Sequence, residues 1–201
     1  MFELAKYGEG NMKQAKVLNE KELSKLFKVC EITNYVERNK LIVAFSYYGG
    51  LRAIEIANLN VNDILTPTNT VSDIIVLSKE QTKGSKRSVV HVGKKLERKI
   101  LRFISKYPNT IHNKGKSLFR SQKGEGFTSQ TIQNLFRNLY NLANIQHASS
   151  HSGRRTFITN LSEKGISTRV IQELARHSSM VTTQRYIDVS NDKLKNAVNA
   201  L

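Results

Sequence analysis

Cysteine is nearly absent from this chain: Cys30 is the only one among 201 residues. A single cysteine excludes an intramolecular disulfide framework and a zinc site that depends on several cysteines. Cys30 lies in the stretch LSKLFKVC, where apolar residues recur at helical spacing. We therefore expect it to be a packed residue of the hydrophobic core.

Long apolar runs are missing as well. The longest one, LIVAFSYYGGL at residues 41–51, has about half the length that a membrane-spanning helix requires. The N-terminus shows no signal-peptide pattern. These two absences favour a cytoplasmic protein with no membrane partner.

Acidic residues are scarce relative to basic ones. The chain has 32 Lys and Arg but 16 Asp and Glu, which gives a formal net charge of +16. Ten basic residues lie between Lys94 and Lys123, where Glu97 is the only acid. A solvated helix face followed by a flexible loop would explain this cluster taken alone. The charge of the whole chain favours a polyanionic partner such as a nucleic acid.

Apolar periodicity predicts one mostly helical domain with a small sheet, an α+β fold. Asn19 followed by Glu22 is a capping-box pattern, which predicts the start of a first helix. Two β-branched runs, SDIIVL at 72–77 and RSVVHV at 87–92, predict an antiparallel hairpin with a basic tip. Further helices are expected at about 35–48, 52–59, 93–107, 128–143, 152–164, 167–176 and 190–199. Leu142 is expected on the apolar face of the helix at 128–143.

The stretch RHSSMVTTQRYID, residues 176–188, places Tyr186 nine residues after His177. In one unbroken helix, nine steps of about 100° would put these side chains on opposite faces. The segment between them contains four residues of the types that end and cap helices: Ser178, Ser179, Thr182 and Thr183. We therefore expect a helix to end near His177 and a loop or short helix to bring Tyr186 back toward it.

Other candidates for chemistry each have an ordinary structural explanation. In GGLRAIEIANL, Arg52 and Glu55 are three residues apart, which alone predicts a surface salt bridge. In HSGRRTF, His151 and Arg154 are also three apart, and a basic patch is the simplest interpretation. Lys83 lies at the expected hairpin tip, QTKGSKR, where a lysine is usually only solvated.

Taken together, the order Arg, Lys, His-x-x-Arg, His, Tyr resembles the tyrosine recombinase, or phage integrase, family. Four segments match family blocks in family order: GLRAIEIANL, KGSKRSVVHV, HSGRRTFITNL and LARHSSMVTTQRYIDVS. The resemblance covers roughly residues 19–201, and any single block would be a weak signal. It implies the mostly helical catalytic domain with one small antiparallel sheet that is typical of this family.

The resemblance implies a site-specific DNA recombinase of the integrase or invertase type, which cleaves and rejoins DNA through a 3′-phosphotyrosyl intermediate. Tyr186 would be the nucleophile, and His151 the base that it needs at neutral pH. Arg52 and Arg154 would stabilise the charge that grows on the phosphate. His177 would be a further hydrogen-bond donor to that phosphate.

Two more roles follow from the same resemblance. Lys83 would be the general acid that protonates the departing 5′ oxygen, and Glu55 would orient Arg52. Covalent storage of the cleaved bond requires no ATP, and the sequence has no carboxylate cluster for Mg²⁺, so neither a cofactor nor a metal is implied. The DNA-binding surface is expected to contain nine basic residues: Lys86, Arg87, Lys94, Lys95, Arg98, Arg120, Lys123, Arg155 and Arg176.

The chain departs from the family pattern at three positions and at its N-terminus. Gly153 and Arg155 stand where the block often has leucine and histidine, and Arg176 stands where a glycine often precedes the second histidine. These changes remove no reacting group, so they affect packing or specificity. Only 18 residues precede the first helix, where most members have a separate DNA-clamping domain. We expect an arm at 1–18 and a catalytic domain at 19–201, in a natural short form or a truncated longer protein.

Double-stranded DNA is the implied substrate, and the implied assembly is a homotetramer on DNA with a monomer as the free form. In this family the C-terminal segment commonly docks on the neighbouring protomer, and a tail helix at 189–201 has an apolar stripe that suits this: Leu194, Ala197, Val198 and Leu201. Accessory DNA-bending proteins and association with the nucleoid are further expectations, with a prokaryotic, viral or plasmid origin.

Three alternative functions stay open. A nicking-closing enzyme of the type IB topoisomerase kind shares the chemistry but acts alone, and the TTQRYIDVS block and the short length favour the recombinase. A catalytically idle DNA-binding regulator would be expected to have lost a reacting group. A histidine-based ribonuclease would give Tyr186 no role.

Overall fold

The computed structural model describes residues 14–82, 86–187 and 198–199. The first half of the chain forms these elements: α1 (Glu20–Cys30), α2 (Val36–Tyr48), α3 (Ala53–Ala57), α4 (Val61–Ile64), β1 (Ile74–Leu77) and β2 (Ser88–His91). The second half forms α5 (Lys94–Lys106), the 3-10 helix η1 (Pro108–His112), α6 (Ser129–Leu142), α7 (Ser152–Glu163), α8 (Thr168–Ala175) and α9 (Met180–Gln184). The described part of the chain is thus mostly helical with a small antiparallel sheet, as the sequence predicted.

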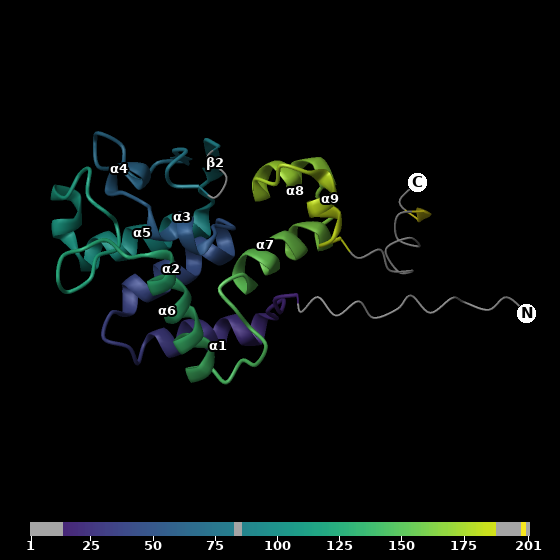
Figure 1. Cartoon of the computed structure of the whole chain (residues 1–201), viewed down its shortest axis with the longest axis horizontal. Helices are drawn as coiled ribbons and strands as arrows, with labels where there is room; N and C mark the ends of the chain where they lie inside the picture. The colour runs from purple at the N-terminus through teal and green to yellow at the C-terminus, as the bar shows by residue number, and fades with distance from the viewer. Residues whose placement is uncertain (1–13, 83–85, 188–197, 200–201) are drawn as a thin grey trace, which may run out of the picture.

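Helix α2 is the centre of the domain. Its residues from Asn39 to Ser46 are all buried, so the helix has no solvent-facing side over this length. A helix of this kind must be covered by other elements. It packs against α1, α5 and α7, and Figure 1 shows it in the middle of these helices.

The hairpin lies at one end of the main body. Strands β1 and β2 pair antiparallel, with Ile74 opposite His91 and Leu77 opposite Ser88. Ile75 and Val90 face the core and are buried, whereas Ile74 and Val89 are exposed. This alternation is typical of a sheet that covers the core with one face only.

A second, smaller core lies beside the first. Ile158 of α7 and Ile171 and Ala175 of α8 are buried together, and Tyr186 and Phe157 pack against them. Helix α7 connects the two cores, because Ile158 lies in the small core and the helix also packs against α2. In Figure 1, α7 runs from α2 toward α8 and α9, which lie above it and to the right of the other helices.

The predicted element boundaries agree with the structure to within two residues for α2, α3, α5 to α8 and both strands. The capping box of Asn19 and Glu22 is confirmed, since each side chain accepts a hydrogen bond from the backbone amide of the other residue. Helices α4 and η1 were not predicted. The prediction that Leu142 lies on the buried face of α6 was wrong, because this side chain is 56% exposed. The predicted helix at 190–199 lies outside the described residues except for 198–199.

The end of the predicted N-terminal arm is packed on the domain. Leu18 is buried, and its amide donates a hydrogen bond to Thr156 Oγ1 at 2.8 Å. Lys16 pairs with Glu22 at 2.5 Å. The folded unit of this chain thus begins before Asn19.

Cys30 is a core residue, as predicted. Its side chain is buried, and burial raises the pKa of the thiol to about 12. Among the described residues, no helix is long and apolar enough to cross a membrane.

Gly153 allows α7 to approach α2 closely. A Cβ atom at Gly153 would lie 2.5 Å from Ser46 Oγ and 3.0 Å from Ser46 Cβ. Carbon atoms in folded proteins do not approach this closely, so a larger residue would force the two helices apart. The glycine at this position, where the resembled block often has leucine, therefore matches a tight helix crossing.

We expect Gly153→Leu to lower the free energy of unfolding by about 1–3 kcal/mol, because overpacking displaces α7 from α2. Chemical denaturation of the purified protein measures this. Gly93→Ala is the control, since a Cβ at Gly93 would meet nothing within 4 Å. Equal stability of the two variants would contradict the proposed close packing.

Candidate active site

Glu55 is a buried anion shared by two arginines. Its side chain is 1% exposed, on the first turn of α3. Oε1 accepts a hydrogen bond from Arg52 Nη1 at 2.7 Å, and Oε2 accepts one from Arg176 Nη2 at 2.9 Å. The backbone amide of Arg52 also donates to Oε2, at 2.8 Å. The Arg52–Glu55 pair is thus not the surface salt bridge that its spacing alone suggested.

The surroundings of Glu55 keep it ionised. Burial by itself raises the pKa of this carboxyl, but Arg176, the amide of Arg52 and the guanidinium of Arg52 outweigh burial. The pKa therefore lies below its ordinary value. Glu55 supplies one full negative charge to the cluster at neutral pH.

The turn before α3 joins the arginines through its carbonyl groups. Gly50 has a φ of 61°, and a Cβ there would lie 2.6 Å from the Phe157 ring, so only glycine fits. Its carbonyl accepts hydrogen bonds from Arg154 Nη1 at 2.5 Å and Arg176 Nη2 at 2.8 Å. Arg176 Nη1 donates to the carbonyl of Gly49 at 3.3 Å.

Arg176 ends α8 in an unusual conformation. Its φ is 56°, in the left-handed region that a glycine adopts without strain. The side chain is 5% exposed, and both terminal nitrogens donate to protein acceptors, including the carbonyl of Leu174 at 3.1 Å. Little of the Arg176 side chain is left to contact DNA, so its predicted role in DNA binding stays a prediction. α8 therefore ends by reversal of the chain at Arg176, before the hydroxyl residues that we expected to stop it.

Arg154 lies on α7 with its guanidinium buried. Its second terminal nitrogen donates to the carbonyl of Ala175 at the end of α8. Burial, together with repulsion from Arg52 and Arg176, lowers the pKa of Arg154 to about 9. Three arginines against the single carboxylate of Glu55 leave a net charge of 3 − 1 = +2, which favours an anion beside them.

His177 and Tyr186 converge as the sequence predicted. α8 ends at Ala175, α9 begins at Met180, and Tyr186 follows the C-cap residue of α9. The two rings stack with centroids 5.7 Å apart and planes at 24°. The turn between the helices therefore brings together side chains that one straight helix would separate.

His177 is a neutral group in this environment. Its Nδ1 lies 2.9 Å from Thr183 Oγ1, within hydrogen-bond distance. Burial lowers the pKa of the imidazole, and the charges of Arg154 and Arg52 lower it further, to about 4. The ring can then donate from one nitrogen only, and its tautomer decides which one.

One cleft of about 940 Å³ brings most of the predicted catalytic residues together. Its lining includes five of them: Arg52, His151, Arg154, His177 and Tyr186. His151 precedes the first turn of α7, and its amide lies 3.3 Å from Ser149 Oγ. Arg155 also lines the cleft, and its guanidinium lies 5.8 Å from the centroid of the Tyr186 ring.

A second cleft of about 700 Å³ adjoins the first. Arg52 and His177 line both clefts, so they lie on the wall between them. Lys86 and Arg87 of the hairpin line only the second one. Lys83 lies outside the described residues, so its predicted role as general acid stays a prediction.

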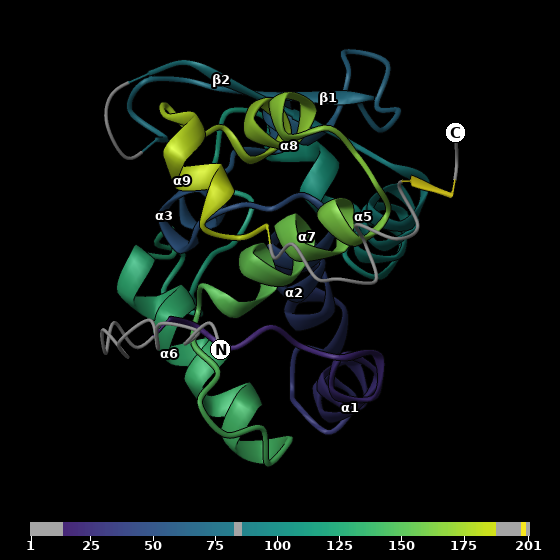
Figure 2. The ribbon, with the colours of Figure 1, turned by 90° about the vertical axis from the view of Figure 1, so that its right-hand side faces the viewer.

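The structure separates the other predicted DNA-binding residues from the clefts. Lys94, Lys95 and Arg98 lie on α5, which packs against the far side of α2. Figure 2 shows α5 on the right, and α3, α9 and β2 on the left. Arg120 lines a different pocket of about 220 Å³, and Lys123 lies in the loop that follows. α5 and the clefts thus lie on different sides of the domain, and the predicted role of these residues in DNA binding stays a prediction.

Two residues that line the larger cleft, and one buried residue beside His177, were not predicted to take part in the site. Thr183 is buried against His177, and Arg185 and His147 line the larger cleft. The sequence marks Thr183 only as a helix-capping type, and no local pattern pairs it with His177. Arg185 was adjacent to the proposed nucleophile and basic. In the described part of the chain, no group of three or more His, Cys, Asp or Glu is placed to hold a metal ion.

Residues 16–193 match the family model described as "Phage integrase family". This chain belongs to the phage integrase family. The match spans α1 to α9 and therefore both cores and most of the residues that line the two clefts.

Curated relatives of this phage integrase family member are tyrosine recombinases. One from Agathobacter rectalis is 31% identical over 171 residues, which is 81% of this chain and 53% of that protein. The tyrosine recombinase XerD of Oceanobacillus iheyensis is 29% identical over 183 residues, 89% of this chain and 59% of that protein. The chain thus spans a little over half the length of these relatives.

Solved structures of the family share the fold. The crystal structure of the XerA recombinase has a TM-score of 0.70 at 24% identity, over 93% of this chain and 66% of that one. The Tn1549 transposon integrase in complex with a circular intermediate DNA has a TM-score of 0.73 at 17% identity, over 100% of this chain and 70% of that one. The mostly helical fold with a small sheet is therefore that of this family.

The depressed pKa of His177 predicts how stability depends on pH. Because the pKa in the folded state is about 4 and the ordinary value is 6.5, the unfolded chain binds more protons between these pH values. We expect the free energy of unfolding to fall as the pH is lowered through this window. His177→Gln should make the dependence weaker, whereas His112→Gln at an exposed position should not. Denaturation curves across the window measure both, and equal slopes would contradict the assignment.

Arg176→Gly tests the buried ion pair. Glycine suits the left-handed backbone, so the end of α8 should persist, but Glu55 keeps only one of its two cations. We expect a loss of about 3 kcal/mol in the free energy of unfolding, as for other broken buried pairs. Arg169→Ala is the control, because it removes an exposed ion pair with Glu173. Alanine is used there because a glycine inside a helix would itself lower stability. An Arg176→Gly variant as stable as Arg169→Ala would show that the pair contributes nothing.

Proposed function

We propose that this chain is the catalytic part of a site-specific DNA recombinase that cleaves and rejoins double-stranded DNA through a 3′-phosphotyrosyl intermediate. The observation that supports this most strongly is the convergence of Arg52, Arg154, His177 and Tyr186 on one cleft with a surplus of positive charge. Membership of the phage integrase family and the recombinases among the relatives support the same reaction.

The proposed reaction is an exchange of one phosphodiester for another. Tyr186 Oη attacks the phosphorus and forms the new P–O bond, its proton passes to a base, and the 5′ oxygen of the DNA leaves. His151 is the proposed base, because it lines the same cleft as Tyr186. The reverse attack by a 5′ hydroxyl of another strand restores the DNA and releases Tyr186.

The arginines act on the charge of the transition state. Attack adds negative charge to the two non-bridging oxygens, and preorganised cations stabilise that charge without having to reorient. Arg52 is held by Glu55, and Arg154 by two backbone carbonyls. His177, which is neutral, would donate a further hydrogen bond from Nε2 when Thr183 donates to Nδ1.

The remaining parts of the proposal concern residues away from this cluster. Lys83 is the proposed general acid, and Lys86 and Arg87, which line the neighbouring cleft, are proposed DNA contacts together with Arg155. A homotetramer on DNA is the proposed assembly, with residues 189–201 as the proposed contact between protomers. A catalytically idle regulator would have no reason to keep these reacting groups in one cleft.

Tyr186→Phe tests the proposal, because it removes the attacking oxygen and leaves the ring. We expect no covalent protein–DNA adduct from this variant on nicked duplex substrates that trap the adduct, while DNA affinity is nearly unchanged. Arg52→Ala should slow adduct formation by about 100-fold or more, as loss of a charged donor to a growing oxyanion does. Tyr140→Phe, at a buried tyrosine outside the clefts, is the matched control and should keep adduct formation. Adduct formation by Tyr186→Phe would exclude Tyr186 as the nucleophile.

A further inference from the structure

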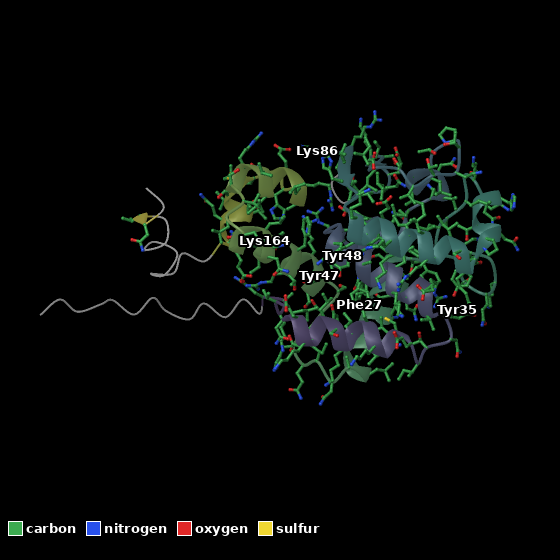
Figure 3. The ribbon with its side chains drawn as sticks, turned by 180° about the vertical axis from the view of Figure 1, so that it is seen from behind. Phe27, Tyr35, Tyr47, Tyr48, Lys86 and Lys164 are labelled. Atoms are coloured by element: carbon green, nitrogen blue, oxygen red, sulfur yellow. The ribbon has the colours of Figure 1, made fainter. Side chains whose placement is uncertain are left out.

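Helix α5 presents a basic face on the side of the molecule that lies opposite the clefts. Leu96, Ile100 and Phe103 face inward and are buried. The other side of the helix is exposed to solvent in the view of Figure 3, which looks at the molecule from behind relative to Figure 1. DNA bound in the clefts would lie near α3, α9 and β2, across the domain from this helix (Figure 2).

The outward residues of α5 form what we call the α5 basic surface: Lys94, Lys95, Arg98, Lys99 and Arg102. Glu97 is the acid on this helix, and it pairs with Lys94 at 3.1 Å. On the neighbouring elements, Glu31 and Glu37 face Lys40, whose Nζ lies 2.9 Å and 4.0 Å from their carboxylates. The nearby acids are thus engaged with cations, and the α5 basic surface keeps a surplus of positive charge.

Aromatic rings position two of these cations. Lys99 Nζ lies 4.5 Å from the centroid of the Phe27 ring, and Lys95 Nζ lies 5.9 Å from that of Tyr48. Phe27 and Tyr48 stack on each other at 6.4 Å, and Figure 3 shows both together with Tyr47 on this face. Cation–π contacts of this kind restrict flexible lysine side chains, so less entropy is lost when a ligand binds them.

The cations of this surface repel one another. Burial lowers the pKa of Lys99, and the charges of Lys40 and Arg102 lower it further. An anion bound across the surface would reverse this repulsion. A polyanion matches the surface better than a single ion, because a helix of 13 residues is about 20 Å long and duplex DNA presents a charge about every 1.7 Å of its axis.

We propose that the α5 basic surface binds a second segment of duplex DNA, on the side of the domain away from the segment in the clefts. A protein partner fits less well, because the surface has Leu101 as its exposed apolar side chain and its rings are covered by lysines, whereas interfaces have an apolar core. The proposal adds a binding surface to the function proposed above and does not depend on cleavage.

A pair of triple variants of equal net charge tests the proposal. Lys95→Gln, Arg98→Gln and Arg102→Gln together neutralise the α5 basic surface. Lys21→Gln, Lys25→Gln and Lys164→Gln together remove three charges from exposed positions elsewhere, and Lys164 is labelled away from α5 in Figure 3. Both variants have a net charge of 16 − 3 = +13, so a difference between them reflects position alone.

The measurement is capture of a second duplex. Protein is bound to an immobilised short duplex, and a labelled duplex is then added over a range of salt concentrations. We expect the wild type and the control variant to capture the labelled duplex, and the α5 variant to capture it at least tenfold more weakly. For the second duplex, the slope of log affinity against log salt should be smaller in magnitude for the α5 variant than for the wild type by about 2 to 3, since each lost phosphate contact contributes about 0.9.

Further variants separate the two surfaces. Arg98→Gln with Arg102→Gln leaves the aromatic contacts of Lys95 and Lys99 intact and should give most of the loss, so the loss of those contacts is not its cause. Arg155→Gln with Arg185→Gln should weaken binding of the first duplex instead. Equal capture by the α5 and control variants, or no capture by the wild type, would overturn the proposal. Adduct formation on the same duplex is scored separately, so a failure of the cleavage chemistry is distinguishable from a failure of capture.

Discussion

The carboxylate of Glu55 is the constraint on which the arrangement of the clefts depends. Three arginines lie close together and two of them are buried, so without a buried anion their repulsion would drive them apart. Because Glu55 binds the start of α3 through Arg52 and the end of α8 through Arg176, one acid fixes two helices that are distant in sequence. The main core and the small core thus have a polar connection in addition to α7.

Most of the fold could be predicted from the sequence because its signals are local. The capping box at Asn19, the β-branched runs of the hairpin and the apolar periodicity of the long helices each depend on residues a few positions apart. The convergence of His177 and Tyr186 could also be predicted, because an unbroken helix would have separated them. Short elements such as α4 have too few residues for a periodic pattern, and they were missed.

What the sequence could not supply is the side of the fold on which a charge lies. Arg176 and Lys94 were both assigned to a DNA surface because both are basic. One is buried against Glu55 and the other lies on α5, across α2 from the clefts. Burial of a cation depends on an acid 121 residues away in the chain, and no local pattern reports such a pair. Family blocks identify residue types, whereas tertiary packing decides their environment.

The place of Tyr186 in the small core has a consequence for the dynamics of this domain. Its ring packs on Ile158, Ile171 and Ala175, a far smaller set of buried side chains than the main core has among the described residues. Segments with few buried apolar contacts open at a lower free energy than the rest of a protein. We therefore expect the segment that contains the proposed nucleophile to open at a lower free energy than α2. Amides of α8 and α9 would exchange with solvent by local opening while those of α2 stay protected. The fraction of molecules with Tyr186 in place in the cleft would depend on that opening equilibrium.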